Sequence, residues 1–202
     1  MSNITNLFAN PDKKGFTDIY SDGEFLMTLS DDAIIEAGLK LGAEIDSDTL
    51  LEIEHAVLLT KAKHKAFTYL GFGDMSDKKL IDKLVHAGFD ADISRECADI
   101  MIGLGYIDNS RYAYNLAHNM ATVKLYGPRR IENELCIRGI SKTDVQNALD
   151  SIDVDFCQNA KTLIKTKFSS KQGQKLVSAL MRYGYEWDCI SPLLHNDEEL
   201  YE

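Results

Sequence analysis

The sequence predicts a mainly α-helical protein of three tandem three-helix repeats, preceded by a small N-terminal β-hairpin and helix extension. The first observation is a pattern that occurs three times, in which two aliphatic residues four positions apart are followed by a glycine four positions later. The second is an Asp-Gly pair between two apolar runs, which is typical of a two-residue hairpin turn. The expected segments are 1–60 for the extension, 61–108 and 109–152 for the first two repeats, and 153–202 for the third repeat with an acidic tail.

The hairpin is expected at Asp22-Gly23, because a type I′ turn needs positive φ at both central residues. The cross-strand pairs predicted by that turn are Tyr20 with Phe25 and Phe16 with Leu29. An isolated hairpin is only marginally stable. We therefore expect either a third strand from residues 4–8 or a helix that packs against the hairpin.

Helical signals begin directly after the hairpin. Ser30 can cap a short helix that runs through Leu39, and Asp46 or Ser47 can open a longer one. From there to residue 194 the pattern indicates helices separated by short turns that contain glycine.

The repeated pattern predicts where the repeats lie. Its three copies are Leu80-Leu84-Gly88, Ile131-Leu135-Gly139 and Leu176-Leu180-Gly184. In each copy the glycine can end a helix at C′ while the next, apolar residue packs back on it. A second short helix is expected after each, at about 91–102, 142–150 and 187–194. The glycine spacings of 51 and 45 residues suit one three-helix unit per repeat. The alternative is that the pattern marks ordinary turns between helices that are not related as repeats.

The net charge of −10 is distributed unevenly. Residues 1–60 hold three basic and twelve acidic side chains, whereas residues 161–182 hold six basic side chains and no acidic one. The overall acidity therefore does not exclude a basic functional surface in the third repeat.

Several functional classes are disfavoured. The four cysteines lie tens of residues apart and the five histidines form no ligand-spaced pair, so neither a metal nor another cofactor is expected. The N-terminus lacks the pattern of a secretory signal, and no apolar run is long enough to span a bilayer. We expect a cytoplasmic protein that is not an enzyme and has no membrane partner.

Two motifs in the middle repeat resemble those of the RecX family. They are GYIDNSRYA (105–113) and KLYGPRRIENELCIRGIS (124–141), which are similar to the family's GYIDDxxFA-like and G-P-x-[RK]-I-x-x-E-L-x-x-[RK]-G-I patterns. The segment SDKKLIDKLVHAGF (76–89) resembles the family's first repeat. The similarity extends from about residue 15 to residue 194.

The resemblance implies an elongated, curved array of three repeats that binds the RecA–DNA filament as a monomer. It further implies that the protein modulates, and most often inhibits, the ATPase and strand-exchange activity of RecA in homologous recombination, DNA repair and the SOS response. No catalytic chemistry belongs to the family. Members are often basic, so the acidity of this chain favours a weak or indirect contact with single-stranded DNA.

Arg129 and Arg130 are the most unusual residues of the middle repeat, because positive charge is disfavoured at a helix N-terminus. They either pair within the helix, with Glu132 and Glu134, or bind an anion together with free backbone N–H groups. The candidate residues for filament or DNA binding are Lys124, Arg129, Arg130, Arg138, Lys161, Lys165, Lys167, Lys171 and Lys175.

Two other functions stay open on the sequence alone. One is a helix-turn-helix protein that binds DNA directly, and the other is a helical-repeat adaptor for a different protein. No aromatic stacking platform is expected beside the basic block, and glycine-rich nucleotide-binding motifs are incomplete.

Overall fold

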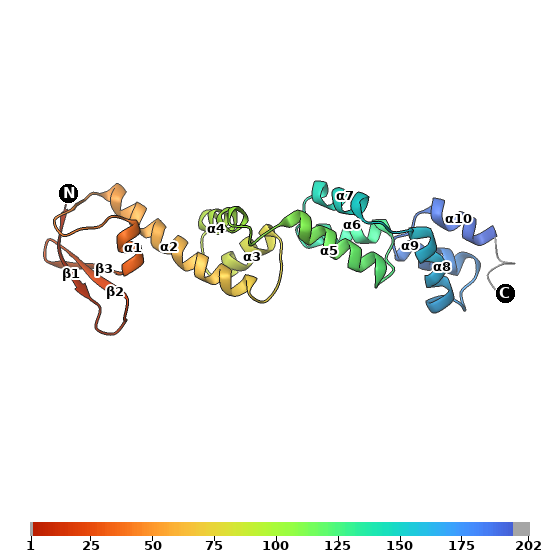
Figure 1. Ribbon diagram of the computed structural model, residues 1–202, viewed down its shortest axis with the longest axis horizontal. Helices are drawn as coiled ribbons and strands as arrows, with labels where there is room; N and C mark the ends of the chain where they lie inside the picture. Colours follow the sequence, from red (N-terminus) through yellow and green to blue (C-terminus); the bar gives the residue numbers. More distant parts are fainter. Residues whose placement is uncertain (1, 196–202) are drawn as a thin grey trace. The chain divides into compact units, whose positions relative to one another are not determined.

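The computed structural model describes residues 2–195, and the acidic tail expected at the C-terminus lies outside the described residues (Figure 1). The elements are β1 (Ser2–Ala9), β2 (Phe16–Ser21), β3 (Glu24–Ser30), α1 (Asp31–Glu36), β4 (Glu44–Ile45), α2 (Ser47–Leu70), α3 (Asp77–His86), α4 (Ala91–Gly103), α5 (Asn109–Thr122), α6 (Pro128–Ile137), α7 (Lys142–Ser151), α8 (Phe156–Lys167), α9 (Gly173–Arg182) and α10 (Trp187–His195). The mainly α-helical architecture, with a small strand region before the helical repeats, is confirmed.

The described residues divide into two compact units. The first holds the residues up to Gly73 together with Leu80–Gly103, and the second holds Asp74–Lys79 together with the residues from Leu104 onward. No described helix is both long enough and apolar enough to cross a membrane.

The first unit contains an antiparallel sheet with strand order β3-β2-β1-β4. Asp22 and Gly23 have φ values of 51° and 87°, as the predicted hairpin turn requires. The predicted pair of Tyr20 with Phe25 is confirmed. The predicted pair of Phe16 with Leu29 is wrong, because a bulge next to Tyr20 shifts the register by one residue, so that Phe16 faces Ser30. Residues 4–8 do supply a third strand, as part of β1.

One face of this sheet packs on α1 and α2. The buried residues of this core include Ile4, Ile19, Leu29 and Ile53. Ser30 caps α1 as expected, but the helix ends at Glu36 rather than Leu39, because Gly38 adopts φ = 63° and the Leu39 N–H bonds the Ile34 carbonyl.

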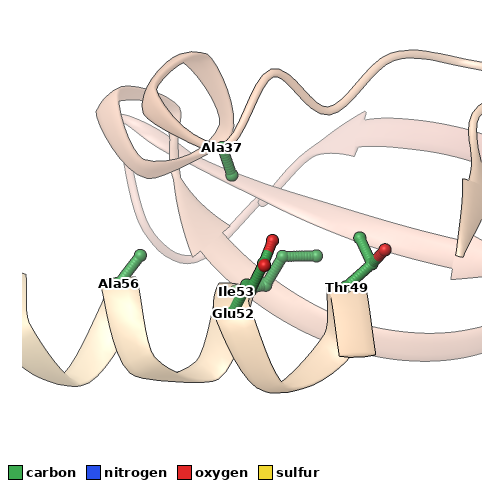
Figure 2. Close-up of a pocket in the computed structure, with 5 residues that line it drawn as sticks. All are labelled: Ala37, Thr49, Glu52, Ile53 and Ala56. Carbon is green, nitrogen blue, oxygen red and sulfur yellow. The ribbon is translucent and has the colours of Figure 1, made fainter. Parts of the chain in front are cut away.

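A shallow hollow lies between α1 and α2. Figure 2 shows the residues that line it, which are Ala37, Thr49, Glu52, Ile53 and Ala56. These five residues offer one carboxylate, from Glu52, and one hydroxyl group, from Thr49.

The glycines of the repeated pattern all end helices in the predicted way. In each copy the residue after the glycine donates its N–H to the carbonyl of the last aliphatic residue, so Phe89 bonds Leu84, Ile140 bonds Leu135 and Tyr185 bonds Leu180. The three glycines have φ values of 97°, 84° and 91°. This is the Schellman geometry, in which a left-handed residue closes the helix and returns the chain to the core. The repeat prediction is therefore confirmed at the level of the backbone.

Candidate polyanion-binding surface

The second unit brings the N-terminus of α6 against the glycine turn that follows α9. The Gly127 N–H donates to the Tyr183 carbonyl at 2.8 Å, and the Arg129 N–H donates to the Gly184 carbonyl at 3.2 Å. A Cβ on Gly127 would lie 2.4 Å from the carbonyl carbon of Gly184, so only glycine permits this approach. We call this contact the 127/184 junction.

The junction overturns one interpretation of the paired arginines. The Arg129 N–H is bonded to Gly184, the Arg130 N–H is bonded to the Gly127 carbonyl, and Pro128 has no N–H. The expectation that free N–H groups of this helix start bind an anion is therefore wrong. The C-terminal carbonyls of α9 carry partial negative charge, and they occupy the position that an anion would take.

Arg129 pairs across the junction rather than within its own helix. Its Nε lies 2.6 Å from Oε1 of Glu186, a residue in the turn after α9. The hydrogen bond that Arg129 donates to Glu186 raises the pKa of its guanidinium, and Glu132 contributes only at a distance. The expected Arg129–Glu132 pair is therefore replaced by a contact between repeats.

Arg130 lies on an aromatic ring. Its guanidinium carbon is 3.9 Å from the ring centroid of Tyr126 and 5.3 Å from that of Tyr183. Its Nη1 also donates to the Arg182 carbonyl at 3.4 Å. The expected partner Glu134 instead lies 4.0 Å from Arg138. A guanidinium that stacks on tyrosine keeps its charge and edge donors available to a ligand.

Three lysines from the candidate set join the same aromatic group. Lys124 lies 5.7 Å from the Tyr126 ring, Lys167 lies 5.0 Å from the Tyr183 ring, and Lys171 lies 5.9 Å from the Phe168 ring. Lys167 also contacts the Tyr183 hydroxyl. The rings pack edge to face, with centroid distances of 5.6 Å for Tyr126–Tyr183 and 5.3 Å for Phe168–Tyr183. The junction cluster, as we define it, comprises Lys124, Tyr126, Arg130, Lys167, Phe168, Lys171 and Tyr183.

The cluster brings three aromatic rings to the basic block, beside which no platform for base stacking was expected; these rings pack on one another and on cations. Sequence reasoning did not include Tyr126 or Tyr183 among the candidate site residues. A usable signal was present, since each tyrosine immediately precedes a junction glycine, Gly127 or Gly184. The pairing of those two glycines in space could not be obtained from their positions in the sequence.

The remaining candidate residues lie elsewhere. Lys161 and Lys165 are exposed on α8 and Lys175 is exposed on α9; among the described contacts, none of them touches the three rings of the cluster. Arg138 lies at the end of α6, where its carbonyl accepts a 3.0 Å hydrogen bond from the Ser76 hydroxyl. The structure therefore gathers four of the nine candidates, Lys124, Arg130, Lys167 and Lys171, into one cluster.

The junction cluster can attract an anion, because four of its seven side chains are cationic. Its four cations are half-buried or exposed, and none of them forms an ion pair with a carboxylate among residues 2–195, where the Arg129–Glu186 pair involves a different arginine. The described residues include no group of three or more His, Cys, Asp or Glu side chains that could hold a metal ion.

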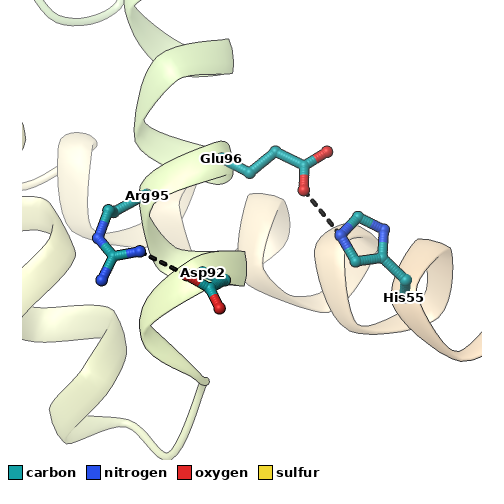
Figure 3. A network of polar contacts seen from close by, with 4 residues as sticks. All are labelled: His55, Asp92, Arg95 and Glu96. Carbon is teal, nitrogen blue, oxygen red and sulfur yellow. Dashed lines mark hydrogen bonds and ion pairs between the residues drawn. The ribbon is translucent and has the colours of Figure 1, made fainter.

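A polar network in the first unit has a different character. Nε2 of His55 on α2 lies 2.8 Å from Oε2 of Glu96 on α4, and Arg95 pairs with Asp92 within α4 (Figure 3). These side chains are largely exposed and of mixed sign. The network links two helices of one unit and gathers no excess of positive charge.

The helices, glycine turns and junctions described above define a protein of tandem three-helix repeats. A family model described as RecX, second three-helix domain, matches residues 108–149. Regulatory protein RecX of Clostridioides difficile is 27% identical over 203 residues, which is 96% of this chain and 95% of the relative. Regulatory protein RecX of Caldanaerobacter subterraneus is 28% identical over 190 residues, which is 91% of this chain and 94% of the relative.

Solved structures agree on the fold. A crystal structure of regulatory protein RecX matches with a TM-score of 0.77 at 21% identity and covers 98% of this chain and 100% of that one. RecX from Lactobacillus salivarius matches with a TM-score of 0.62 at 22% identity and covers 69% of this chain and 96% of that one. The chain is thus similar to proteins named regulatory protein RecX along nearly its whole length, as its middle-repeat motifs indicated.

Proposed function

We propose that this chain regulates the RecA recombinase by binding the RecA–DNA filament and lowering its ATPase and strand-exchange activity. The observation that carries the proposal is the similarity to proteins named regulatory protein RecX along nearly the whole chain. The protein acts by occupancy rather than by chemistry, in the cytoplasm and as a monomer.

The junction cluster is the surface that we propose for the polyanionic side of this contact. Lys124, Arg130, Lys167 and Lys171 supply positive charge, and the three rings hold them in place. Lys161, Lys165 and Lys175 extend the basic surface along α8 and α9. Neutralising phosphates with lysine and arginine releases counterions, so the contact weakens as salt rises.

Arg129 and Arg138 have smaller proposed roles. Arg129 is already paired with Glu186, and Arg138 lies 4.0 Å from Glu134, so a ligand must compete with an internal carboxylate at both positions. The two residues contribute to the overall field and to the repeat junctions more than to direct binding.

The test is the DNA-dependent ATP hydrolysis of RecA in the presence of the purified chain. We expect inhibition by the unaltered protein and weaker inhibition by Lys167→Glu/Lys171→Glu, because two cations of the cluster become anions. The matched control is Lys14→Glu/Lys40→Glu, two exposed lysines of the first unit, which is expected to inhibit like the parent. If the unaltered protein leaves ATP hydrolysis and strand exchange unchanged, the proposal fails.

Binding measurements separate this proposal from direct DNA binding. The chain is expected to bind the assembled filament more tightly than bare single-stranded DNA or duplex DNA at the same salt concentration. Equal or tighter binding to bare duplex, with a steep salt dependence, would instead favour a DNA-binding helix-turn-helix protein.

A further inference from the structure

The N-terminal sheet has an outer face, opposite the one packed on α1 and α2, that displays aromatic side chains. Phe8 on β1, Tyr20 on β2 and Phe25 on β3 form an aromatic stripe across three adjacent strands. Neighbouring rings meet edge to face, with centroid distances of 5.7 Å for Phe8–Tyr20 and 5.8 Å for Tyr20–Phe25. Phe8 is 54% exposed and Phe25 is 57% exposed.

The stripe does not contribute to the core of the first unit. That core is built from the alternate residues of the same strands, such as Ile19 on β2 and Leu29 on β3, which are almost fully buried. Contiguous apolar groups on a surface mark interaction sites more often than isolated ones do. The aromatic stripe is thus a candidate docking surface.

Three acidic residues adjoin the stripe, and one lysine, Lys13, lies over the Phe16 ring at the far end of β2. Asp18 is the direct cross-strand neighbour of Phe8, and Asp22 and Glu24 lie at the hairpin end beside Phe25. We call these three carboxylates the acidic border. Hydrogen bonds from Thr28 and from the Asn10 side chain hold the pKa of Asp18 below its ordinary value, so this carboxylate is charged at neutral pH.

The nature of the occupant follows from this combination. Phosphate groups would be repelled by the acidic border, and surfaces that stack nucleic-acid bases need a positive groove for the backbone. Arginine and lysine, in contrast, are attracted both to the faces of aromatic rings and to carboxylates. We propose that the outer face of the sheet binds a basic segment of a partner protein, with its cationic side chains on the aromatic stripe and against the acidic border.

A labelled synthetic peptide of alternating arginine and serine provides the probe, and its fluorescence anisotropy is followed as the full-length chain is added. The informative variant is Phe8→Leu/Phe25→Leu, which keeps the apolar character of the strands but removes two aromatic faces. We expect its affinity for the peptide to fall by about two- to fivefold per ring. Phe72→Leu, a change at an 87% exposed phenylalanine of the same unit, is the matched control and is expected to bind like the parent.

A second variant tests the charge. Asp22→Asn/Glu24→Gln is expected to weaken peptide binding at low salt and to differ less from the parent at high salt. Two results overturn the proposal: equal peptide affinity in Phe8→Leu/Phe25→Leu and in the parent, or binding of an oligothymidine strand that this double variant abolishes. Because the probe contains neither RecA nor DNA, its outcome is independent of the filament experiment.

Discussion

Two repeat junctions of the second unit share one backbone feature, a left-handed glycine at the end of a helix, but different side chains surround them. At the 127/184 junction the N-terminus of α6 meets the glycine turn after α9. At a second contact, the 76/139 junction, the N-terminus of α3 meets the glycine turn after α6. In both, a left-handed glycine with φ between 84° and 91° ends one helix where another begins.

The groups that complete the two junctions are not the same. At 76/139 the buried Ser76 hydroxyl donates a hydrogen bond to the Arg138 carbonyl and accepts one from the Lys79 N–H. A neutral side chain therefore connects the two helix ends. At 127/184 the contact is made by backbone groups, and cations with tyrosine rings surround it. A left-handed glycine is thus common to both junctions, and a basic residue lies against each glycine, Lys78 at Gly139 and Arg130 at Gly184.

The largest effect on stability is expected when the glycine of a junction turn is replaced by alanine. In Gly184→Ala the new Cβ would lie 2.4 Å from the Arg130 backbone nitrogen at φ = 91°, whereas in Gly139→Ala it would lie 2.9, 3.0 and 3.1 Å from Cδ, Cβ and Cγ of Lys78, a side chain that can move more easily than backbone. We expect Gly184→Ala to lower the free energy of unfolding by about 2–5 kcal/mol, from strain plus overpacking. For Gly139→Ala we expect the strain part, about 1–2 kcal/mol.

Urea denaturation measures both values. Gly105→Ala is the control, because Gly105 has φ = 76° and no neighbour within 4 Å of a new Cβ, so it reports strain alone. A loss in Gly184→Ala no greater than that in Gly105→Ala would contradict the tight backbone approach at the 127/184 junction.

The next effect concerns one hydrogen bond beside each junction. Ser76→Ala removes a helix cap and a donor to Arg138, and Tyr185→Phe removes the 2.8 Å bond from the phenol to the Leu125 carbonyl. Each is expected to lower the free energy of unfolding by about 1–2 kcal/mol, since a half-buried carbonyl loses its donor. Losses well below this range would show that water replaces the missing donors.

Stability at alkaline pH is expected to depend on two titrating residues near the 127/184 junction, Tyr185 and Cys189. Burial raises the pKa of the Tyr185 phenol above its ordinary range, and burial together with the Cys157 side chain raises the pKa of Cys189 to about 12 from an ordinary 9.0. Both groups are neutral acids in the folded state. The unfolded chain therefore loses these protons first as pH rises, and stability is intact below about pH 9 and declines above it.

The decline of stability with pH can be followed by measuring melting temperatures between neutral and strongly alkaline pH. Cys189→Ala and Tyr185→Phe are expected to show a shallower decline than the parent, whereas Ser76→Ala, which removes no titrating group, keeps the parental slope. An unchanged slope in both of the first two variants would contradict the assignment.

The periodic part of this fold could be predicted from the sequence. The aliphatic pairs and glycines of the repeats follow from helix geometry and from the conformational freedom of glycine, and those predictions are confirmed at Gly88, Gly139 and Gly184. The hairpin turn was predicted for the same reason, at Asp22-Gly23. Helix ends and turns were therefore predicted correctly at the positions where the backbone conformation favours glycine.

The errors arose where distant segments meet. Nothing local showed that the carbonyl of Gly184 would fill the N-terminus of α6, or that Arg130 would lie on Tyr126 rather than pair with Glu134. The bulge beside Tyr20, which moved Phe16 opposite Ser30, likewise depends on the third strand and the packing of the sheet. The candidate surface was predicted as a list of charged residues, and only the fold could select the four that cluster.

The smallest expected effect concerns the ion pair at the 127/184 junction. Arg129 and Glu186 are both at least half exposed, so Arg129→Glu is expected to lower the melting temperature only slightly, and less at high salt. Arg111→Glu, at an exposed arginine of the same unit, is the control for a general change of charge.

The swapped variant Arg129→Glu/Glu186→Arg keeps the ion pair but exchanges its charges. Its stability therefore reports how the dipoles of the two helix ends act on those charges. A glutamate at the start of α6 would be favoured by that helix, but at 127/184 the carbonyl end of α9 lies against the same turn and favours a cation. The two dipoles oppose each other, so the swapped protein is expected to melt close to the parent and no higher. A clearly higher melting temperature at low salt would show that the α6 terminus dominates, and that Arg129 is retained at a cost in stability for binding.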